Sequence, residues 1–235
     1  MELNSPDLRR VIRMTPKAVL NLMKERGLIL AGGAIRNIVR GDPASDLDLF
    51  AATQETLKDA AHQLVRDWGA DRIWKTENAW TVFAQGRHPV QFIMRWKFGN
   101  PEDCIKSFDF TACQAAVWFA DGRWLSATAK SFYADCASRR LTYTSPEREE
   151  EAAGSMMRVR KFLAKGWHID AENLAAVMAR VFAKIDLEAV EGPDGGWQHS
   201  KEARLAFVIS GLLREVDPLT PVDGLEAAEE KDEEL

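Results

Sequence analysis

The order of apolar and polar residues divides the chain into two parts. Up to about residue 142, short apolar or alternating stretches recur between helical ones, and these stretches predict strands. They are "LILA" (28–31), "SDLDLFAA" (45–52), "RIWKT" (72–76), "AWTVFA" (79–84) and "VQFIM" (90–94). From about residue 145 only helical patterns remain, in 145–166, 170–190 and 200–216. The pattern predicts an α+β domain at 1–142 and a helical domain at 143–223.

Capping residues mark where the predicted helices begin and end. In the first predicted helix, 15–27, Thr15 is the expected N-cap, Pro16 the first helical residue and Gly27 the stop. Further along, Gly32 and Gly33 directly follow the strand 28–31 and open a short helix. The sequence therefore predicts a glycine turn between a buried strand and a helix.

Charge and cysteine content exclude several classes of protein. The net charge of −5 lies entirely in 226–235, which carry six acids and one lysine, so 224–235 are expected to form a solvated, disordered tail. Three cysteines and four histidines show no disulfide framework and no zinc-ligand spacing. No apolar run approaches the roughly 18 residues of a membrane span, and no signal peptide opens the chain. We expect a cytoplasmic protein.

Two aspartates follow the glycine turn at alternate positions of the next strand. Asp46 and Asp48 share one face of that strand, where two carboxylates can bind the same hard cation. Phosphate groups bind well to the exposed N–H groups of a glycine turn that opens a helix. Gly32, Gly33, Asp46 and Asp48 together predict a pocket for a metal-bound nucleoside triphosphate. The alternative is a plain turn followed by aspartates on a solvated strand edge.

The stretch "GGAIRNIVRGDPASDLDLF" resembles the signature of the nucleotidyltransferase (polymerase-β-like) superfamily, in the branch of poly(A) polymerases and CCA-adding enzymes. "SFDFTACQAAVW" resembles a second motif of that branch, and "HPVQFI" the strand before it. The resemblance covers about 27–141, with a weaker likeness of "SMMRVRKFLAKGWHID" to the basic neck helix that follows the head domain. It implies an α+β, nucleotidyltransferase-type mixed sheet with helices, followed by a small helical domain.

The resemblance also implies roles for individual residues. Asp46, Asp48 and Asp109 would bind divalent metal, Mg²⁺ or Mn²⁺, and would be the catalytic carboxylates. The nucleotide-binding residues would be Gly32, Gly33, Arg36, Lys106 and Thr111. An NTP would be the substrate and pyrophosphate the released product. For Arg36, a surface salt bridge is the alternative role.

The chain also departs from the pattern of that branch. Asn37 stands where the branch has an aspartate, and Cys113 where it has an asparagine. Ser107 and Phe108 replace paired arginines that would contact the nucleotide, and Lys106 is the one cation nearby. The choice of base therefore does not carry over. The chain also has no room for the body and tail domains of complete CCA-adding enzymes, so we do not expect faithful CCA addition.

A basic helix in the second half favours RNA as acceptor. The stretch 156–167 carries four basic residues and no acid, which could contact RNA phosphates or form an ordinary solvated face. They are Arg158, Arg160, Lys161 and Lys165. Trp167 and Trp197 are expected to be exposed and available for stacking on bases.

Three functions remain open from the sequence. The first is transfer of a nucleoside monophosphate to a hydroxyl, with an RNA 3′ end (tRNA or another small RNA) as the preferred acceptor. The second is a minimal enzyme of toxin or defence type that modifies a protein, a small molecule or a nucleotide. The third is an inactive nucleotide-binding module. The sequence does not determine which NTP is used or the oligomeric state.

Overall fold

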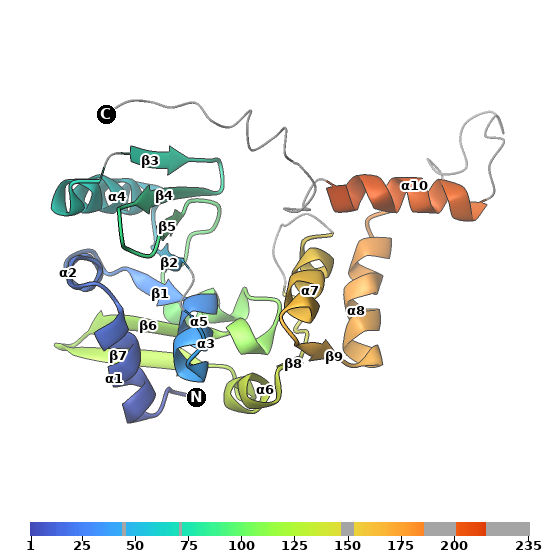
Figure 1. The fold of residues 1–235 in the computed structure, drawn as a ribbon, viewed down its shortest axis with the longest axis horizontal. Helices are drawn as coiled ribbons and strands as arrows, with labels where there is room; N and C mark the ends of the chain where they lie inside the picture. Colours follow the sequence, from blue (N-terminus) through green and yellow to red (C-terminus); the bar gives the residue numbers. More distant parts are fainter. Residues whose placement is uncertain (44–45, 71, 147–152, 186–200, 215–235) are drawn as a thin grey trace. The chain divides into compact units, whose positions relative to one another are not determined.

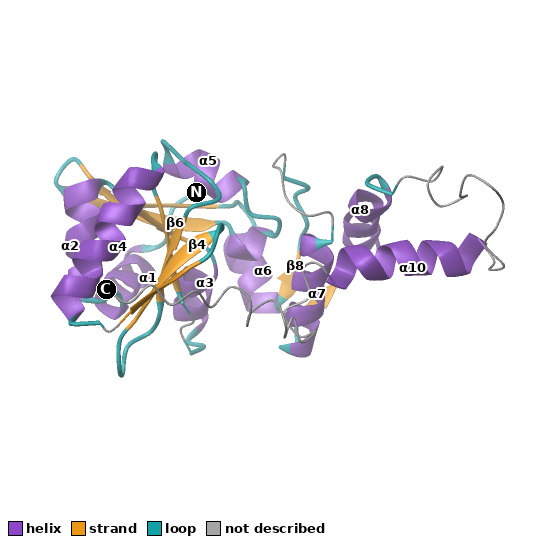
Figure 2. Ribbon diagram, turned by 90° about the horizontal axis from the view of Figure 1, so that it is seen from above, coloured by secondary structure: helices purple, strands orange, loops and turns teal. Residues whose placement is uncertain are grey.

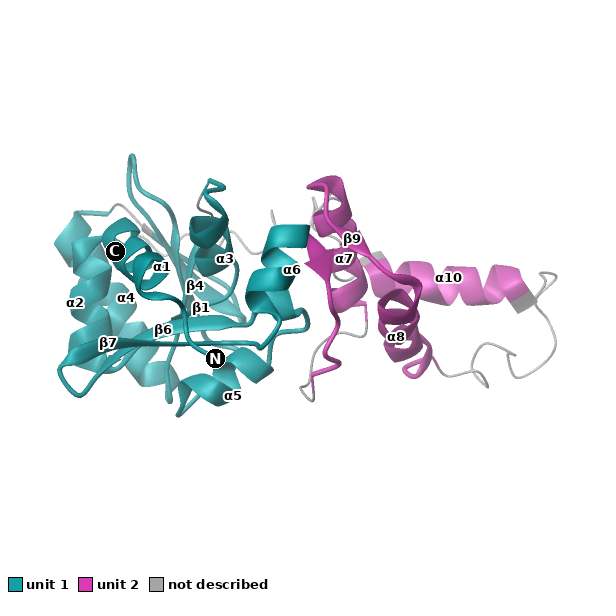
Figure 3. Ribbon diagram, turned by 90° about the horizontal axis from the view of Figure 1, so that it is seen from below, with its two compact units in different colours: residues 1–138, 229–235 teal, residues 139–228 magenta. Residues whose placement is uncertain are grey.

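The computed structural model describes residues 1–43, 46–70, 72–146, 153–185 and 201–214. The chain forms two compact units, with the division between Ser138 and Arg139 (Figure 3). The acidic tail expected at 224–235 lies outside the described residues, as does Trp197. The sequence pattern places the domain boundary after residue 142.

The first unit is built around a seven-stranded sheet with the strand order β3-β4-β5-β2-β1-β6-β7 (Figure 1). Every neighbouring pair is antiparallel except β2 and β5, which are parallel. The α+β class and the mixed sheet predicted for this chain are confirmed. The strands are β1 (Ile29–Ala31), β2 (Leu47–Phe50), β3 (Arg72–Lys75), β4 (Ala79–Phe83), β5 (Val90–Ile93), β6 (Ala115–Ala120) and β7 (Arg123–Thr128).

Helices pack on both faces of this sheet (Figure 2). One face contacts α2 (Lys17–Arg26), α3 (Gly33–Arg40) and α4 (Gln54–Trp68), and α1 (Ser5–Met14) packs on α3. The other face contacts α5 (Pro101–Lys106) over β1, β6 and β7. The apolar cluster on the α5 face includes Ile29, Phe50 and Ile105, which explains why both sides of β1 are buried.

Two features at the N-terminus differ from the expectation. Helix α1 was not predicted, although Asn4 caps it through its side chain and Pro6 stands in its first turn. Thr15 is not the N-cap of α2 but follows the end of α1, where its hydroxyl donates to the carbonyl of Val11. Pro16 occupies the N-cap position of α2. The stop at Gly27 is as expected, with φ +64°.

The first unit ends with a 3₁₀ turn, η1 (Thr111–Cys113), ahead of β6, and with α6 (Phe132–Ser138) after β7. The backbone at residue 1 pairs with β7, since Met1 and Thr128 exchange backbone hydrogen bonds. All three cysteines are buried and unbridged.

The second unit contains α7 (Gly154–Ala164), α8 (Ala171–Phe182), α10 (Lys201–Arg214) and a two-stranded parallel ladder of β8 (Arg140–Leu141) and β9 (His168–Ile169). The strand β9 was not expected in the helical half. Trp167 was expected to be exposed, but it is 7% exposed and packs against Phe162 with ring centroids 5.1 Å apart. The hydrophobic contact at the end of α7 explains its burial.

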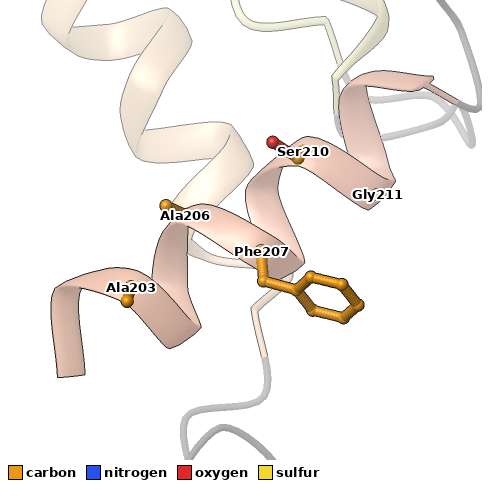
Figure 4. Close-up of a pocket in the computed structure, with 5 residues that line it drawn as sticks. All are labelled: Ala203, Ala206, Phe207, Ser210 and Gly211. Atoms are coloured by element: carbon orange, nitrogen blue, oxygen red, sulfur yellow. The ribbon is translucent and has the colours of Figure 1, made fainter. Parts of the chain in front are cut away.

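A shallow pocket lies along α10 (Figure 4). Its lining residues are Ala203, Ala206, Phe207, Ser210 and Gly211, all from this one helix. They offer a ligand one hydroxyl group and no charge. Among the described helices, none combines the length and the apolar character needed to cross a membrane.

Candidate functional site

The glycine turn between β1 and α3 has a backbone that only glycine adopts without strain. Gly32 has φ +90°, and its N–H donates to the carbonyl of Ala115 at 3.0 Å. A Cβ at Gly32 would lie 2.9 Å from the ring of Phe108 and 3.6 Å from Asp48 Oδ2. Helix α3 begins at Gly33 with no side-chain cap. The first N–H groups of α3 are therefore available to an anion.

The two aspartates of the DxD pattern lie close together beside this turn. Asp48 is in β2, directly opposite Ala31 of β1, and Asp46 comes just before the strand. Removal from water raises the pKa of Asp48 from its ordinary value of 3.8 to about 8, and the charge of Asp46 adds to the shift. Burial raises the pKa of the Cys104 thiol on α5, and the negative charge of Asp48 raises it further.

Such a pair binds either a proton or a cation. The raised pKa means that a second negative charge at this place is costly unless a positive charge accompanies it. Two carboxylates are the usual protein contribution to a magnesium site, with phosphates and water completing the coordination. Within the ranges that the structure describes, no group of three or more His, Cys, Asp or Glu side chains is arranged to hold a metal ion.

Asp109, expected as the third carboxylate, is 2% exposed and lies between two aromatic residues. Phe108 before it packs edge-on against Phe50, with ring centroids 5.9 Å apart. The carbonyl of Phe108 accepts a hydrogen bond from the Gln114 side chain at 2.8 Å. The segment is thus held over the glycine turn by the ring of Phe108, and Asp109 belongs to no metal-binding group of three in the described chain.

Two of the expected nucleotide-binding residues, Arg36 and Thr111, make hydrogen bonds to protein groups. Arg36 is 8% exposed, and its guanidinium donates to Asn37 Oδ1 and to Cys113 Sγ at 3.1 Å. Thr111 is also buried, and its hydroxyl donates to Asp135 Oδ2 at 2.5 Å. Asp135 is fully buried in α6. These five residues form what we call the α3 polar network, which ties α3, η1 and α6 together.

The remaining expected residues are cations on helices. Lys106 is exposed in the last turn of α5, two residues before Phe108. In the second unit, Arg160 and Lys161 are exposed on α7, Lys165 is exposed just after it, and Arg158 is partly buried.

Three residues near the site received no role from the sequence. Gln91 lies directly opposite Asp48 in the parallel pairing of β5 with β2. Phe108 lies against the glycine turn, and Asp135 accepts from Thr111. The alternation in "VQFIM" shows on which face of its own strand Gln91 lies. Its position opposite Asp48 depends on the pairing of β5 with β2, which are separated in the chain by residues 51–89. No local signal marks Asp135.

The fold is that of CCA-adding enzymes. The Thermotoga maritima CCA-adding enzyme complexed with tRNA matches with a TM-score of 0.53 and 15% identity, over 88% of this chain and 48% of that chain. A CCA-adding enzyme in complex with CTP matches with a TM-score of 0.54 and 13% identity, over 86% and 54%. An apo form of a CCA-adding enzyme matches with a TM-score of 0.55 and 13% identity, over 94% of this chain and 53% of that chain. The resemblance predicted from the sequence is confirmed as a likeness of fold.

The chain spans about half the length of these solved structures. A search of curated protein sequences finds no match. A family model described as "Gabija anti-defense 2 family protein" matches residues 7–139, which cover the sheet, the glycine turn and both aspartates. The chain therefore belongs to the Gabija anti-defense 2 family.

Proposed function

We propose that this chain is a metal-dependent nucleotidyltransferase that moves a nucleoside monophosphate from an NTP to a hydroxyl group, with an RNA 3′ end as the acceptor. One observation carries the proposal: a pair of crowded carboxylates, Asp46 and Asp48, lies beside an uncapped glycine turn. Two of the CCA-adding enzymes with this fold were solved in complex with tRNA and with CTP. Their shared fold supports the same class of chemistry here.

Asp46 and Asp48 would hold the divalent ion, since they are the crowded pair whose repulsion a cation relieves. Bound Mg²⁺ or Mn²⁺ would stabilise charge on the attacking and leaving oxygens. The first N–H groups of α3 would bind the triphosphate beside Asp48. Lys106, exposed in the last turn of α5, would contact the phosphates, and the partly exposed ring of Phe108 would stack on a base without selecting it.

The transfer balances as an in-line displacement. A bond forms between the acceptor oxygen and the α-phosphorus, and the bond from that phosphorus to the bridging oxygen of the β-phosphate breaks. The electron pair leaves with pyrophosphate. The hydroxyl proton passes to solvent water.

The direct test uses α-labelled NTPs, Mg²⁺ or Mn²⁺, and a mixture of small RNAs. We expect label on RNA with the wild type and none with Asp48→Asn. Asp59→Asn, which removes an exposed acid on α4, is the matched control and should keep full activity. Equal transfer by wild type and Asp48→Asn would contradict the proposal. Tight NTP binding without pyrophosphate release would instead indicate an inactive nucleotide-binding module.

Membership in an anti-defence family favours a second candidate acceptor. This acceptor would be a protein, small molecule or nucleotide of the Gabija defence system, modified by the same carboxylates. Incubation with labelled NTP and lysates that contain or lack the Gabija components separates the two. Label on a protein or a small molecule only when those components are present would support this candidate over RNA.

A further inference from the structure

A row of residues crosses the sheet from the carboxylates to its outer edge. The pairings place Asp48 of β2 opposite Gln91 of β5, Gln91 opposite Thr81 of β4, and Thr81 opposite Trp74 of β3. Residues paired directly across strands point to the same face of a sheet. The row therefore lies on the face that carries Asp48, which is the face opposite to α4.

The packing of α4 confirms which face this is. Trp80 alternates with Thr81 along β4 and meets His62 of α4 edge-on, with ring centroids 5.5 Å apart. Val82 and Phe92 are fully buried on the same side as Trp80. On the opposite side, Gln91 and Trp74 are partly exposed, while Thr81 between them is 8% exposed. Gln91 and Trp74 thus form the accessible part of the row.

The geometry of in-line transfer indicates on which side of Asp48 the acceptor approaches. The glycine turn lies on the β1 side of Asp48, and Gln91 lies on the β5 side. Attacking and leaving oxygens must lie on opposite sides of the transferred phosphorus. Since the triphosphate would bind at the glycine turn, the acceptor hydroxyl has to approach from the β5 side, over Gln91.

The outer end of the row has the properties of a surface that binds single-stranded nucleic acid. Trp74 meets Phe83 at 6.5 Å between ring centroids, and Phe83 is 39% exposed. The basic residues Lys75 and Arg87 do not add to this face, since they lie over Trp80 and Trp68 on the α4 side. The exposed aromatic rings therefore define it, and such rings stack on unpaired bases.

We propose that the face of β5, β4 and β3 opposite to α4 binds the 3′-terminal nucleotides of a single-stranded RNA acceptor, with Gln91 at its last ribose and Trp74 and Phe83 under its bases. This inference rests on the proposed function and adds the place and the chemical class of the acceptor. Three strand spacings separate Asp48 from Trp74, about 14 Å, which corresponds to about four stacked nucleotides at about 3.4 Å each.

The carboxamide of Gln91 favours RNA over DNA. It offers one acceptor and two donor hydrogens, and it makes no side-chain hydrogen bond to a described residue. The terminal 2′-hydroxyl of RNA, both donor and acceptor, lies next to the reacting 3′-hydroxyl and would contact Gln91 beside Asp48. DNA lacks this group.

The experiment measures binding of a 5′-fluorescein-labelled, unstructured eight-nucleotide RNA to the full chain by anisotropy, with Mg²⁺ and a non-hydrolysable ATP analogue. A second oligonucleotide differs only by a 2′-deoxy terminal nucleotide. Trp74→Ala should weaken binding about 10-fold, since stacking of one base contributes about 1–3 kcal/mol. Gln91→Ala should remove the preference for the ribose-ended oligonucleotide while leaving the analogue-plus-Mg²⁺ rise in melting temperature unchanged.

A matched control lies at the other edge of the sheet. Trp124 of β7 also pairs edge-on with a phenylalanine, Phe119, at 5.2 Å, and Lys24 lies over its ring. Trp124→Ala should leave RNA binding unchanged. If Trp74→Ala fails to fold, Phe83→Ala, which alters an exposed ring, measures the same surface and should weaken binding at least 3-fold.

The outcomes separate this inference from the proposed function. If the ATP analogue and Mg²⁺ together do not raise the melting temperature of the wild type, the proposed function itself is contradicted. Intact stabilisation with no RNA binding, or RNA binding that is insensitive to the Trp74, Phe83 and Gln91 variants, would overturn this inference alone. Label transfer to a protein acceptor that is equally insensitive to these variants would overturn it as well.

Discussion

The first unit contains two polar regions, the α3 polar network and the pair Asp46 and Asp48. They differ in how their polar groups are paired. In the α3 polar network, Arg36 donates to Asn37 and Cys113, and the fully buried Asp135 accepts from Thr111. At the carboxylate pair, burial and the charge of Asp46 raise the pKa of Asp48 to about 8. In the first region donors meet acceptors, whereas in the second a like charge acts on Asp48.

The difference teaches which polar residues to assign to function. Compensated groups stabilise the fold, because each donor or acceptor that loses its partner stays buried and unpaired. Uncompensated like charges cost stability and persist where a ligand completes them. By this criterion the carboxylates remain proposed ligands of the metal. Arg36 and Thr111 support α3 and the glycine turn through their protein contacts, and their role toward the nucleotide stays a prediction.

The largest expected effect is on activity at the carboxylate pair. Asp48→Asn and Asp46→Asn should each lower transfer about 1,000-fold, as expected when charge stabilisation in the transition state is removed. Both variants should also lose the rise in melting temperature that NTP plus Mg²⁺ gives the wild type. Thermal shift with and without the ligands measures this. A normal ligand response in both variants would show that the pair is not the metal site.

The next largest effect is on stability at the α3 polar network. Asp135→Ala should lower the free energy of unfolding by about 3 kcal/mol, because it removes the acceptor of the Thr111 hydroxyl and leaves a cavity at a fully buried position. Thr111→Val should cost about 1–2 kcal/mol. Urea unfolding of both single variants and the double variant gives their coupling energy. Additive losses would contradict a direct Thr111–Asp135 interaction.

A smaller effect is expected where the two regions meet, at the glycine turn. Gly32→Ala should lower stability by about 2 kcal/mol, since it places a Cβ at φ +90° and 2.9 Å from the Phe108 ring. Gly69→Ala is the control, because Gly69 has φ +59° but nothing within 4 Å of its built Cβ. It should cost about 1 kcal/mol. Equal costs would mean that the Phe108 contact contributes nothing.

The smallest effect, when measured over one pH unit, is the pH dependence of stability that Asp48 contributes. Its pKa is raised on folding, so the native state binds more protons than the unfolded state between pH 3.8 and about 8. Stability should therefore fall as pH rises through this window, by about 1 kcal/mol between pH 6 and pH 7. Asp48→Asn should remove that decline and be the more stable protein at pH 7.5. A parallel pH profile for both proteins, measured by urea unfolding, would contradict the shift.

Short sequence patterns were enough to predict the fold class and the central residues of the proposed site. The glycine turn and the DxD pattern lie within 17 consecutive residues, 32–48, so spacing alone places them on adjacent elements. The helix stop at Gly27 was readable because the left-handed backbone there favours glycine. Helix α1 was missed because its polar sequence is short and its single buried residue is Val11.

Non-local contacts could not be predicted from the sequence. Whether Arg36 contacts phosphate or protein depends on Cys113, 77 residues away in the chain. The place of Gln91 depends on the parallel pairing of β5 with β2, and the burial of Trp167 depends on how the chain after α7 turns back onto Phe162. Helix and strand periodicity describes one element at a time, so it contains no information about such partners.

The parallel pairing of β2 with β5 also determines the order in which the sheet assembles. Parallel strands need a long connection, and here it contains α4 and the β3–β4 hairpin, which can form from local contacts. Strand β2 can pair with β1 early, but its other edge is closed only when β5 arrives. Gln91 comes to lie opposite Asp48 only in this last step. The acceptor side of the proposed site is therefore expected to form after its nucleotide side.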